Sequence, residues 1–339
     1  MAEVILITGG AGFIGSHLAK KLIEQGKKVI IADSFLSGMD NLFSLGLSQS
    51  DFELRQVDLA NFSDAKKALE GVDTVFHMAA RVGGISYVHG NKNTEAISME
   101  TNIAIDANVF RACQEAGVKK IIYSSSVSVY PMKKQESLGA VFSEDDFTVK
   151  ILNSRFKIPD STLDLDGGYG LAKALGEIEL SMMEGIKVGI ARTFSAYGEN
   201  ESLGEKAHVL PRLIKNAIKY PEDEMVIWGD GAQTRDYIYV TDCAEALIKL
   251  AEAIENNSPI VVNVGAGVSV SIGELAEKII AISGKDIKPV YLKEKPVGPM
   301  SRTADISRAK EILGWVPKVS LDEGLEREYR WIEGKLKTV

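Results

Sequence analysis

The chain has 339 residues, 45% of them apolar and 25% charged, which is the composition of an ordinary globular protein. The formal net charge of −8 argues against a basic nucleic-acid-binding surface. Two cysteines, Cys113 and Cys243, imply no disulfide framework, and no segment has the ~18 consecutive apolar residues of a membrane span. The N-terminus lacks a basic leader, so we predict a cytoplasmic protein that binds neither nucleic acid nor membrane.

Short apolar runs alternate with longer helical patterns in the first half of the chain. Strands are expected at 4–8, 29–32, 52–57, 74–77 and 121–124, and helices at 12–25, 63–69 and 94–116. Strands that alternate with helices predict right-handed βαβ units and a parallel sheet that helices cover on both faces.

The rhythm of the pattern loosens in the second half. After a helix that ends near 183 and a strand at 188–192, helices are expected near 210–219, 242–254, 272–280 and 306–313, with strands near 225–227 and 260–264. We therefore predict an α/β fold with a Rossmann-type doubly wound parallel sheet in residues 1–185. Residues 186–339 are predicted to form mostly a smaller α/β substrate lobe, with some segments returning to the sheet.

A glycine-rich turn follows the first strand and opens the first helix. Gly9 permits a tight turn, Gly12 lets a pyrophosphate approach the backbone, and Gly15 permits close packing of helix on strand. Asp33 ends the second strand, where a carboxylate binds the adenosine ribose and favours NAD over NADP. The alternative is a purely structural glycine turn with a surface aspartate. The residues of this turn predicted to bind NAD are Gly9, Gly12, Phe13, Ile14 and Gly15.

The spacing of these glycines resembles the extended short-chain dehydrogenase/reductase superfamily. Asp58 and Leu59, after the third strand, resemble the family's adenine-reading position. The segment 77–80 resembles the loop that passes beside the cofactor, which adds Ala79 and Ala80 to the predicted NAD site.

A tyrosine and a lysine four residues apart, Tyr169 and Lys173, are the next signal. This spacing places both side chains on one helix face, although such a pair alone is more often an exposed surface. A neighbouring ammonium and the nicotinamide cation would lower the tyrosine pKa, so that Tyr169 could take a proton from a sugar hydroxyl. Ser126, at the carboxyl end of the fifth strand, matches the catalytic Ser/Thr of the family, and Lys173 is expected to contact NAD as well.

The resemblance extends over nearly the whole chain, to the NAD-dependent nucleotide-sugar epimerase/dehydratase family. It implies an enzyme with bound NAD, a nucleotide-diphosphate sugar as substrate, no metal, and a homodimer formed by the helices around 94–116 and 169–183. The separation of Ser126 and Tyr169 is longer than is usual in the family. The extra segment, 133–165, is expected to be a surface excursion, either a lid or simple loop decoration.

Three positions in the second half resemble the family's substrate-binding motifs. Arg235 and Arg302 are predicted to clamp the diphosphate, or else to form structural ion pairs. Ser195 stands where the family usually has an asparagine, which weakens one expected contact to the phosphates.

Ser126, Val127 and Ser128 favour one reaction of the family. Dehydratases and decarboxylases carry an acidic residue just after the catalytic hydroxyl, and this chain has Val127 and Ser128 there. The pattern instead resembles 4-epimerases, in which a transient 4-keto sugar turns over and recovers its hydride. Ser128 is also expected to contact the substrate.

A rival prediction is a GDP-sugar 3,5-epimerase, with or without reduction at C4. It depends on Gly83, Gly84, Lys206 and His208, which resemble residues of such enzymes, although His208 could equally be a helix-start residue. Those enzymes have a cysteine where this chain has Ser128, and a hydroxyl is a weaker base than a thiol. A 4-dehydrogenase or dehydratase and a non-catalytic NAD-sensing protein remain further alternatives.

Overall fold

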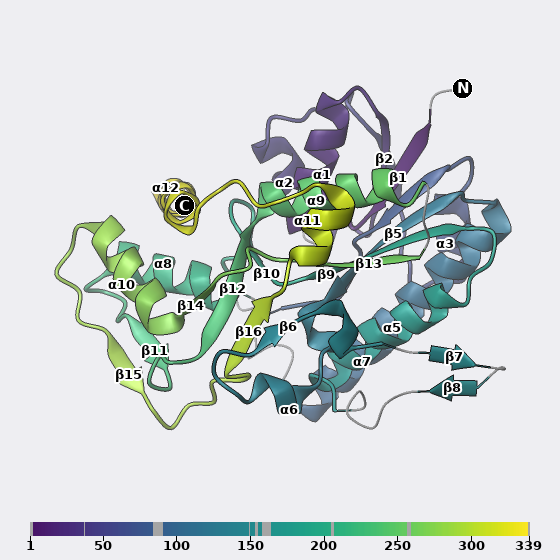
Figure 1. Ribbon diagram of the computed structural model, residues 1–339. Helices are drawn as coiled ribbons and strands as arrows, with labels where there is room; N and C mark the ends of the chain where they lie inside the picture. Colours follow the sequence, from purple (N-terminus) through teal and green to yellow (C-terminus); the bar gives the residue numbers. More distant parts are fainter. Residues whose placement is uncertain are drawn as a thin grey trace.

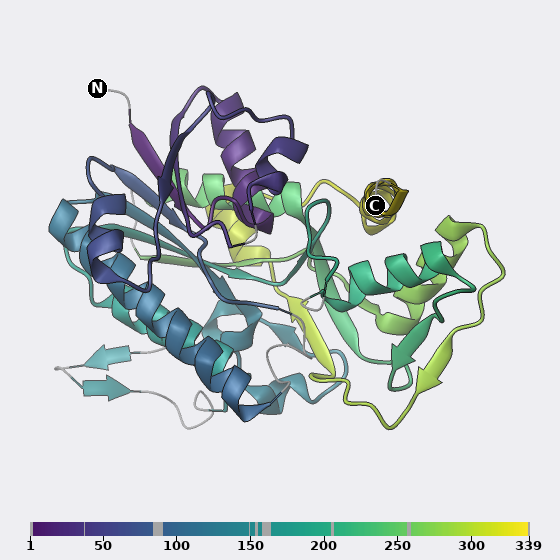
Figure 2. The ribbon, with the colours of Figure 1, turned by 180° about the vertical axis from the view of Figure 1, so that it is seen from behind.

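The computed structural model describes residues 3–36, 38–83, 91–148, 150–152, 155–157, 164–204, 207–255 and 259–337. A large sheet with helices on both faces forms one lobe, and a smaller lobe of helices and short strands lies beside it (Figure 1). Seen from behind, the same two lobes stay side by side, and the C-terminal helix packs on the smaller lobe (Figure 2).

The large sheet has seven parallel strands in the order β13-β9-β5-β4-β1-β2-β3. The predicted doubly wound parallel sheet is therefore confirmed. Two of its strands come from the second half of the chain, as expected for segments that return to the sheet. The strands are β1 (Val4–Thr8), β2 (Lys28–Asp33), β3 (Glu53–Gln56), β4 (Thr74–His77), β5 (Lys120–Ser126), β9 (Lys187–Thr193) and β13 (Ile260–Val264).

Alternating side chains of the strands feed two separate apolar cores. Ile5 and Ile7 of β1 pack in the core below α1, α9 and α11, whereas Leu6 points into the core below α3 and α5. This period of two is what a sheet covered on both faces requires. The covering helices are α1 (Phe13–Glu24), α2 (Asp40–Ser44), α3 (Phe62–Ala68), α5 (Lys92–Ala116), α7 (Gly167–Ser181), α9 (Val240–Ala253) and α11 (Ser307–Leu313).

The smaller lobe is built on a second sheet in the order β10-β12-β16-β6, in which β6 is Val141–Phe142 and β14 pairs with β12. Its core gathers apolar side chains from three helices and from β12. The elements are α8 (Val209–Lys219), α10 (Ile272–Ser283), α12 (Leu321–Lys337), β10 (Ser195–Tyr197), β11 (Val226–Trp228), β12 (Thr234–Tyr239), β14 (Ser269–Ser271), β15 (Val290–Leu292) and β16 (Ser301–Ala304).

The segment between β5 and α7 is partly built into the fold. It contains η1 (Val127–Val129), α6 (Met132–Gln135), β6 (Val141–Phe142), η2 (Glu144–Asp146) and an antiparallel hairpin of β7 (Lys150–Leu152) and β8 (Arg155–Lys157). Phe142 is fully buried, and β6 pairs in parallel with β16. The expectation of a surface excursion is therefore wrong for the part of the segment around β6.

Candidate active site

The glycine turn has the geometry that a dinucleotide site needs. Gly9 has a left-handed φ of 66°, and a Cβ on it would lie 2.8 Å from the backbone of Ala79. A Cβ on Gly15 would lie 2.2 Å from the carbonyl oxygen of Gly9, so only glycine lets α1 pack this closely on β1. Gly12 precedes Phe13 at the start of α1, and no side chain caps this end. The first N–H groups of α1, including that of Ile14, can therefore meet a phosphate.

Asp33 lies at the end of β2, beside the glycine turn. Its Oδ2 accepts the N–H of Ala11 at 3.1 Å, and its Oδ1 accepts the N–H of Phe35 at 2.9 Å. A carboxylate has about four acceptor sites, so two remain for the hydroxyls of a ribose. The same side chain thus fixes the turn and retains the capacity predicted from the sequence.

The other predicted cofactor residues lie at the same edge of the sheet. Asp58 is exposed, and its Oδ1 accepts the N–H of Ala60 at 3.0 Å. Leu59 is buried in the core below α3 and α5. Ala79 donates its N–H to the hydroxyl of Thr8 at 3.2 Å, while Ala80 is half-buried in the loop that follows β4.

Three predicted catalytic side chains meet where β5 ends and α7 begins. Tyr169, in the first turn of α7, lies close enough to Ser126 for the serine hydroxyl to lower the tyrosine pKa. Lys173, one turn further on, is 2% exposed, and its Nζ lies 6.0 Å from the centroid of the Tyr169 ring. The Oγ of Ser126 also accepts the N–H of Ser128 at 3.1 Å, which fixes its direction.

Burial has the largest effect on the pKa values of Tyr169 and Lys173. It raises the pKa of Tyr169, and the charges of Asp106 and Asp166 add to that rise, whereas the hydroxyl of Ser126 lowers it. Burial also lowers the pKa of Lys173. In the protein without NAD, desolvation outweighs the effects that lower the pKa of Tyr169. The expected lowering by the ammonium of Lys173 together with the nicotinamide cation stays a prediction.

Arg302, on β16 of the smaller lobe, reaches the start of α7, close to the catalytic trio. Its guanidinium pairs with Asp166, three residues before Tyr169, and its Nε donates to the Oε1 of Gln135 at 2.6 Å. Asp166 also accepts the hydroxyl of Ser128 at 3.2 Å. This one carboxylate therefore links the catalytic edge of the sheet to the smaller lobe.

Arg235 lies beside Arg302, because β12 and β16 pair in register at these two residues. It is 9% exposed and donates to the backbone carbonyls of Thr234, Val297 and Pro299. Burial and the charge of Arg302 lower the pKa of Arg235 to about 10. Two adjacent guanidinium groups have the charge that an anion with more than one charge could bind.

The remaining predicted substrate residues that the structure describes lie on separate elements. Ser195 begins β10 in register with Tyr237, Gly83 is half-buried after β4, and Gly84 and Lys206 lie outside the described residues. His208 precedes α8, its side chain is 49% exposed, and its Nδ1 lies 2.6 Å from the buried Oε1 of Glu201. Burial lowers the pKa of His208, but the hydrogen bond to Glu201 and the negative charge of Glu201 together raise it overall.

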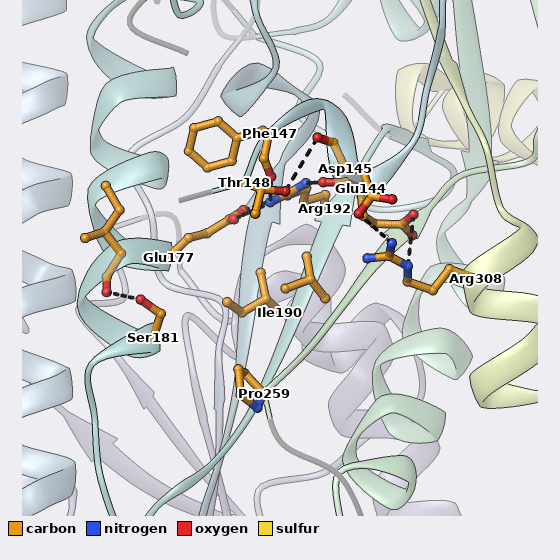
Figure 3. Close-up of a pocket in the computed structure, with 12 residues that line it drawn as sticks. Glu144, Asp145, Phe147, Thr148, Glu177, Ser181, Ile190, Arg192, Pro259 and Arg308 are labelled. Atoms are coloured by element: carbon orange, nitrogen blue, oxygen red, sulfur yellow. Dashed lines mark hydrogen bonds and ion pairs between the residues drawn. The ribbon is translucent and has the colours of Figure 1, made fainter. Parts of the chain in front are cut away.

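A cavity of about 190 Å³ lies elsewhere, between α7, η2 and α11 (Figure 3). Arg192 is directed toward Glu177 at 2.7 Å, and Arg308 lies 2.8 Å from Asp145. Because its charged side chains pair with one another and none of the predicted catalytic residues lines it, this cavity is not the candidate active site.

Three residues of the site were not among those predicted from the sequence. Asp166 and Gln135 hold Arg302, and the negative charge of Asp106 raises the pKa of Lys173. The position of Asp166, just before a helix that bears Tyr169, could have indicated it. Gln135 lies in the insertion, and its contact depends on how β16 packs.

Comparison with known proteins identifies the family. Residues 5–265 match the NAD dependent epimerase/dehydratase family. The chain belongs to this family. A GDP-mannose 3,5-epimerase of Arabidopsis thaliana is 30% identical over 98% of this chain and 83% of its own length. No helix within the described ranges is long and apolar enough to cross a membrane.

Two solved structures share the fold. The UDP-glucose 4-epimerase of Thermotoga maritima with UDP-glucose has a TM-score of 0.82 and 28% identity, covering 98% of this chain and 99% of that one. The UDP-glucuronic acid 4-epimerase of Bacillus cereus with UDP-glucuronic acid and NAD has a TM-score of 0.80 and 30% identity, with the same coverage.

NAD is the cofactor of this family, and the residues of the chain fit it. The uncapped start of α1 and the absence of a Cβ at Gly12 suit a pyrophosphate, and Asp33 retains acceptors for a ribose. The described residues hold no group of three or more His, Cys, Asp or Glu that could bind a metal ion.

Proposed function

We propose that the chain is a nucleotide-sugar 4-epimerase that acts through a transient 4-keto sugar. The placement of Tyr169 beside Ser126 and the buried Lys173 carries this proposal. A hydroxyl donor, a phenol and an ammonium at the carboxyl edge of a parallel sheet are the groups that an alcohol oxidation needs. Two solved neighbours named as 4-epimerases support the choice of C4.

Each side chain of the trio has its own role at the C4 hydroxyl of the sugar. Ser126 donates a hydrogen bond to the reacting oxygen, and Tyr169 removes the hydroxyl proton as a base. Lys173 supplies positive charge that favours the phenolate. NAD, when bound, accepts and returns the hydride and adds a positive charge near the phenol. When the keto sugar presents its other face, Tyr169 returns the proton and the inverted alcohol forms.

The diphosphate of the substrate binds to Arg235 and Arg302. These adjacent arginines place charge-assisted donors between the lobes, and the ion pair with Asp166 directs Arg302 toward the catalytic edge. His208, which precedes α8, and Ser195, at the start of β10, are further proposed contacts of the nucleotide-sugar.

A 3,5-epimerase is the second candidate, and one contact favours it. The hydrogen bond between His208 and Glu201 is the arrangement of an acid–base dyad, and a relative of A. thaliana is named for this reaction. Against it, the hydroxyl of Ser128 donates to Asp166 instead of standing as a free base. We therefore place 4-epimerisation first.

We further propose a homodimer formed by α5 and α7. These two helices pack side by side on one face of the large sheet (Figure 2). Their outer surfaces carry partly exposed apolar side chains, which a second copy of the same helix pair would cover. These side chains are Ile97, Leu171, Leu175 and Met182.

Incubation of the purified protein with UDP-, GDP-, dTDP- and CDP-sugars tests the function. We expect one of these sugars to be converted to its C4 epimer without net formation of NADH, because the hydride returns to the substrate. Accumulation of stoichiometric NADH would show a dehydrogenase instead. Loss of water or carbon dioxide from the sugar would show a dehydratase or a decarboxylase.

A further inference from the structure

A buried chain of hydrogen bonds runs beneath the catalytic edge and ends at Asp106 of α5. The hydroxyl of Thr8 accepts the N–H groups of Met78 and Ala79 and lies 2.7 Å from Nδ1 of His77. Because this oxygen already accepts two bonds, its own proton goes to Nδ1. Nε2 of His77 therefore carries a hydrogen and donates to Asp106 at 3.0 Å.

Asp106 receives a second hydrogen bond from β5. The hydroxyl of Tyr123 donates to its Oδ2 at 2.5 Å, and the two side chains are 0% and 3% exposed. Burial raises the pKa of Asp106, but Lys173 and the donors His77 and Tyr123 hold it below its usual value. Burial lowers the pKa of His77, because it disfavours the charged form, and the imidazole therefore stays neutral. Asp106 is thus an ionised carboxylate whose two hydrogen-bond partners are uncharged.

Helix α7 brings the cation to this carboxylate. Nζ of Lys173 lies 4.5 Å from the centroid of the Tyr123 ring, above the phenol that donates to Asp106. Gly176, three residues further along α7, makes the approach possible. A Cβ there would lie 2.5 Å from the Tyr123 hydroxyl and 2.9 Å from Oδ2 of Asp106. The fold therefore keeps side-chain volume out of the space where these groups meet.

We propose that Asp106 is a positioning residue that supplies the negative charge needed to hold Lys173 as an ammonium in its buried position. A buried ammonium is costly unless an opposite charge acts on it, and the ionised carboxylate of Asp106 on α5 supplies that charge. Glu177, on α7 itself, adds a second negative charge but is already paired with Arg192. The inference rests on the proposed role of Lys173 and adds a residue outside the substrate's reach.

The negative charge of Asp106 shifts the pKa values of Lys173 and Tyr169 in the same direction. It raises the pKa of Lys173 against the effect of burial, and it also raises the pKa of Tyr169. Removing it therefore lowers both values. The acidic limb of the pH–rate profile, set by Tyr169, and the alkaline limb, set by Lys173, should both move to lower pH.

The substitution Asp106→Asn tests this, because it removes the charge and nearly keeps the shape. The first readout is independent of turnover: the ¹³Cε resonance of Lys173 in the NAD-bound protein, assigned by its loss in Lys173→Arg. We expect its titration midpoint to fall by about one pH unit or more, as for the loss of a near opposite charge. An unchanged midpoint would overturn the proposal.

The second readout is the pH–rate profile of the same variant, with Tyr123→Phe as the matched control. That control removes one hydrogen bond to Asp106 but keeps the charge, so its limbs should stay in place. Lower activity in Asp106→Asn at every pH, with unmoved limbs, would mean a merely structural residue and would also contradict the proposal. If the wild-type protein converts no nucleotide-sugar, the proposed function fails, while the lysine titration still decides the role of Asp106.

Discussion

Arg302 is held in a defined direction before any substrate arrives. Gln135 fixes its Nε from the insertion, and Asp166 pairs with its terminal nitrogen from the N-terminus of α7. A guanidinium that is already oriented loses little conformational freedom when it binds a phosphate. Asp166 and the diphosphate therefore compete for the same N–H donors of the Arg302 guanidinium.

The substitution Arg302→Ala should weaken the binding of the nucleotide-sugar by about tenfold or more, the size of a lost charge-assisted hydrogen bond. Isothermal titration calorimetry with the uridine and guanosine diphosphates measures this directly. Gln135→Ala should weaken binding less, because it loosens the side chain and leaves its charge. Equal affinity of Arg302→Ala and wild type would exclude a phosphate-binding role.

Tyr169→Phe removes one hydroxyl from the catalytic trio. We expect turnover to fall below detection and bound NAD to stay, because the ring and Lys173 remain in place. Product analysis gives the first quantity, and mass spectrometry of the ligand released on denaturation gives the second. Turnover near that of the wild type would show that another group removes the proton.

At the scale of elements, the junction of β1 and α1 depends on two glycines with different tasks. A Cβ at Gly15 would enter the van der Waals radius of the Gly9 carbonyl at 2.2 Å, whereas one at Gly12 would lie 3.1 Å from the same atom. The first glycine is therefore required for packing, and the second leaves space at the start of the helix.

We expect Gly15→Ala to lower Tm by several degrees, since overpacking typically costs about 1–3 kcal/mol. Gly12→Ala should change Tm of the NAD-free protein less and weaken NAD binding more. Thermal unfolding with and without added NAD separates the two effects. The assignment is wrong if the two variants lose the same stability and the same affinity.

The sequence predicted best the elements that are buried on both sides. Residues 4–7 and 260–262 are continuous apolar runs, so their strands are evident from the chain alone. β12 was missed because Arg235 and Asp236 interrupt its apolar pattern, although Asp236 is buried and accepts three backbone N–H groups. The polar helix α12 was missed because only one narrow face of it is buried.

The residues of the candidate site likewise fall into those that the sequence could predict and those that it could not. Ser126, Tyr169 and Lys173 could be predicted because their spacing is local and tied to elements that the pattern shows. Asp106 could not, since its role depends on two helices that pack together across Gly176. Long-range contacts of this kind leave no periodic signal in one sequence.

At the scale of the whole molecule, the exposed apolar face of α5 and α7 should set the oligomeric state. Leu175 is 42% exposed on α7, and a charge there would be buried unpaired in the proposed interface. We expect Leu175→Glu to shift the protein from dimer to monomer in sedimentation equilibrium. Ile312→Glu, equally exposed on α11 across the sheet, is the control and should leave the mass unchanged. A wild type that is itself monomeric would refute the dimer.

The two lobes supply different parts of the proposed reaction. The large lobe carries Ser126 on β5, Tyr169 on α7 and the glycine turn, whereas the smaller sheet carries the two arginines. The Asp166–Arg302 pair joins the lobes, so the sugar is expected to lie between a fixed redox edge and a fixed anion clamp. Within that space the 4-keto sugar must be able to turn.

Epimerisation in D₂O, with the product analysed by mass spectrometry and NMR, tests the central claim most directly. The account predicts a C4 epimer that contains no carbon-bound deuterium, because the hydride leaves the substrate and returns to it without meeting solvent. Deuterium at C3 or C5 would contradict it, since those positions exchange only when a base removes a carbon-bound proton, as in the 3,5-epimerase reaction.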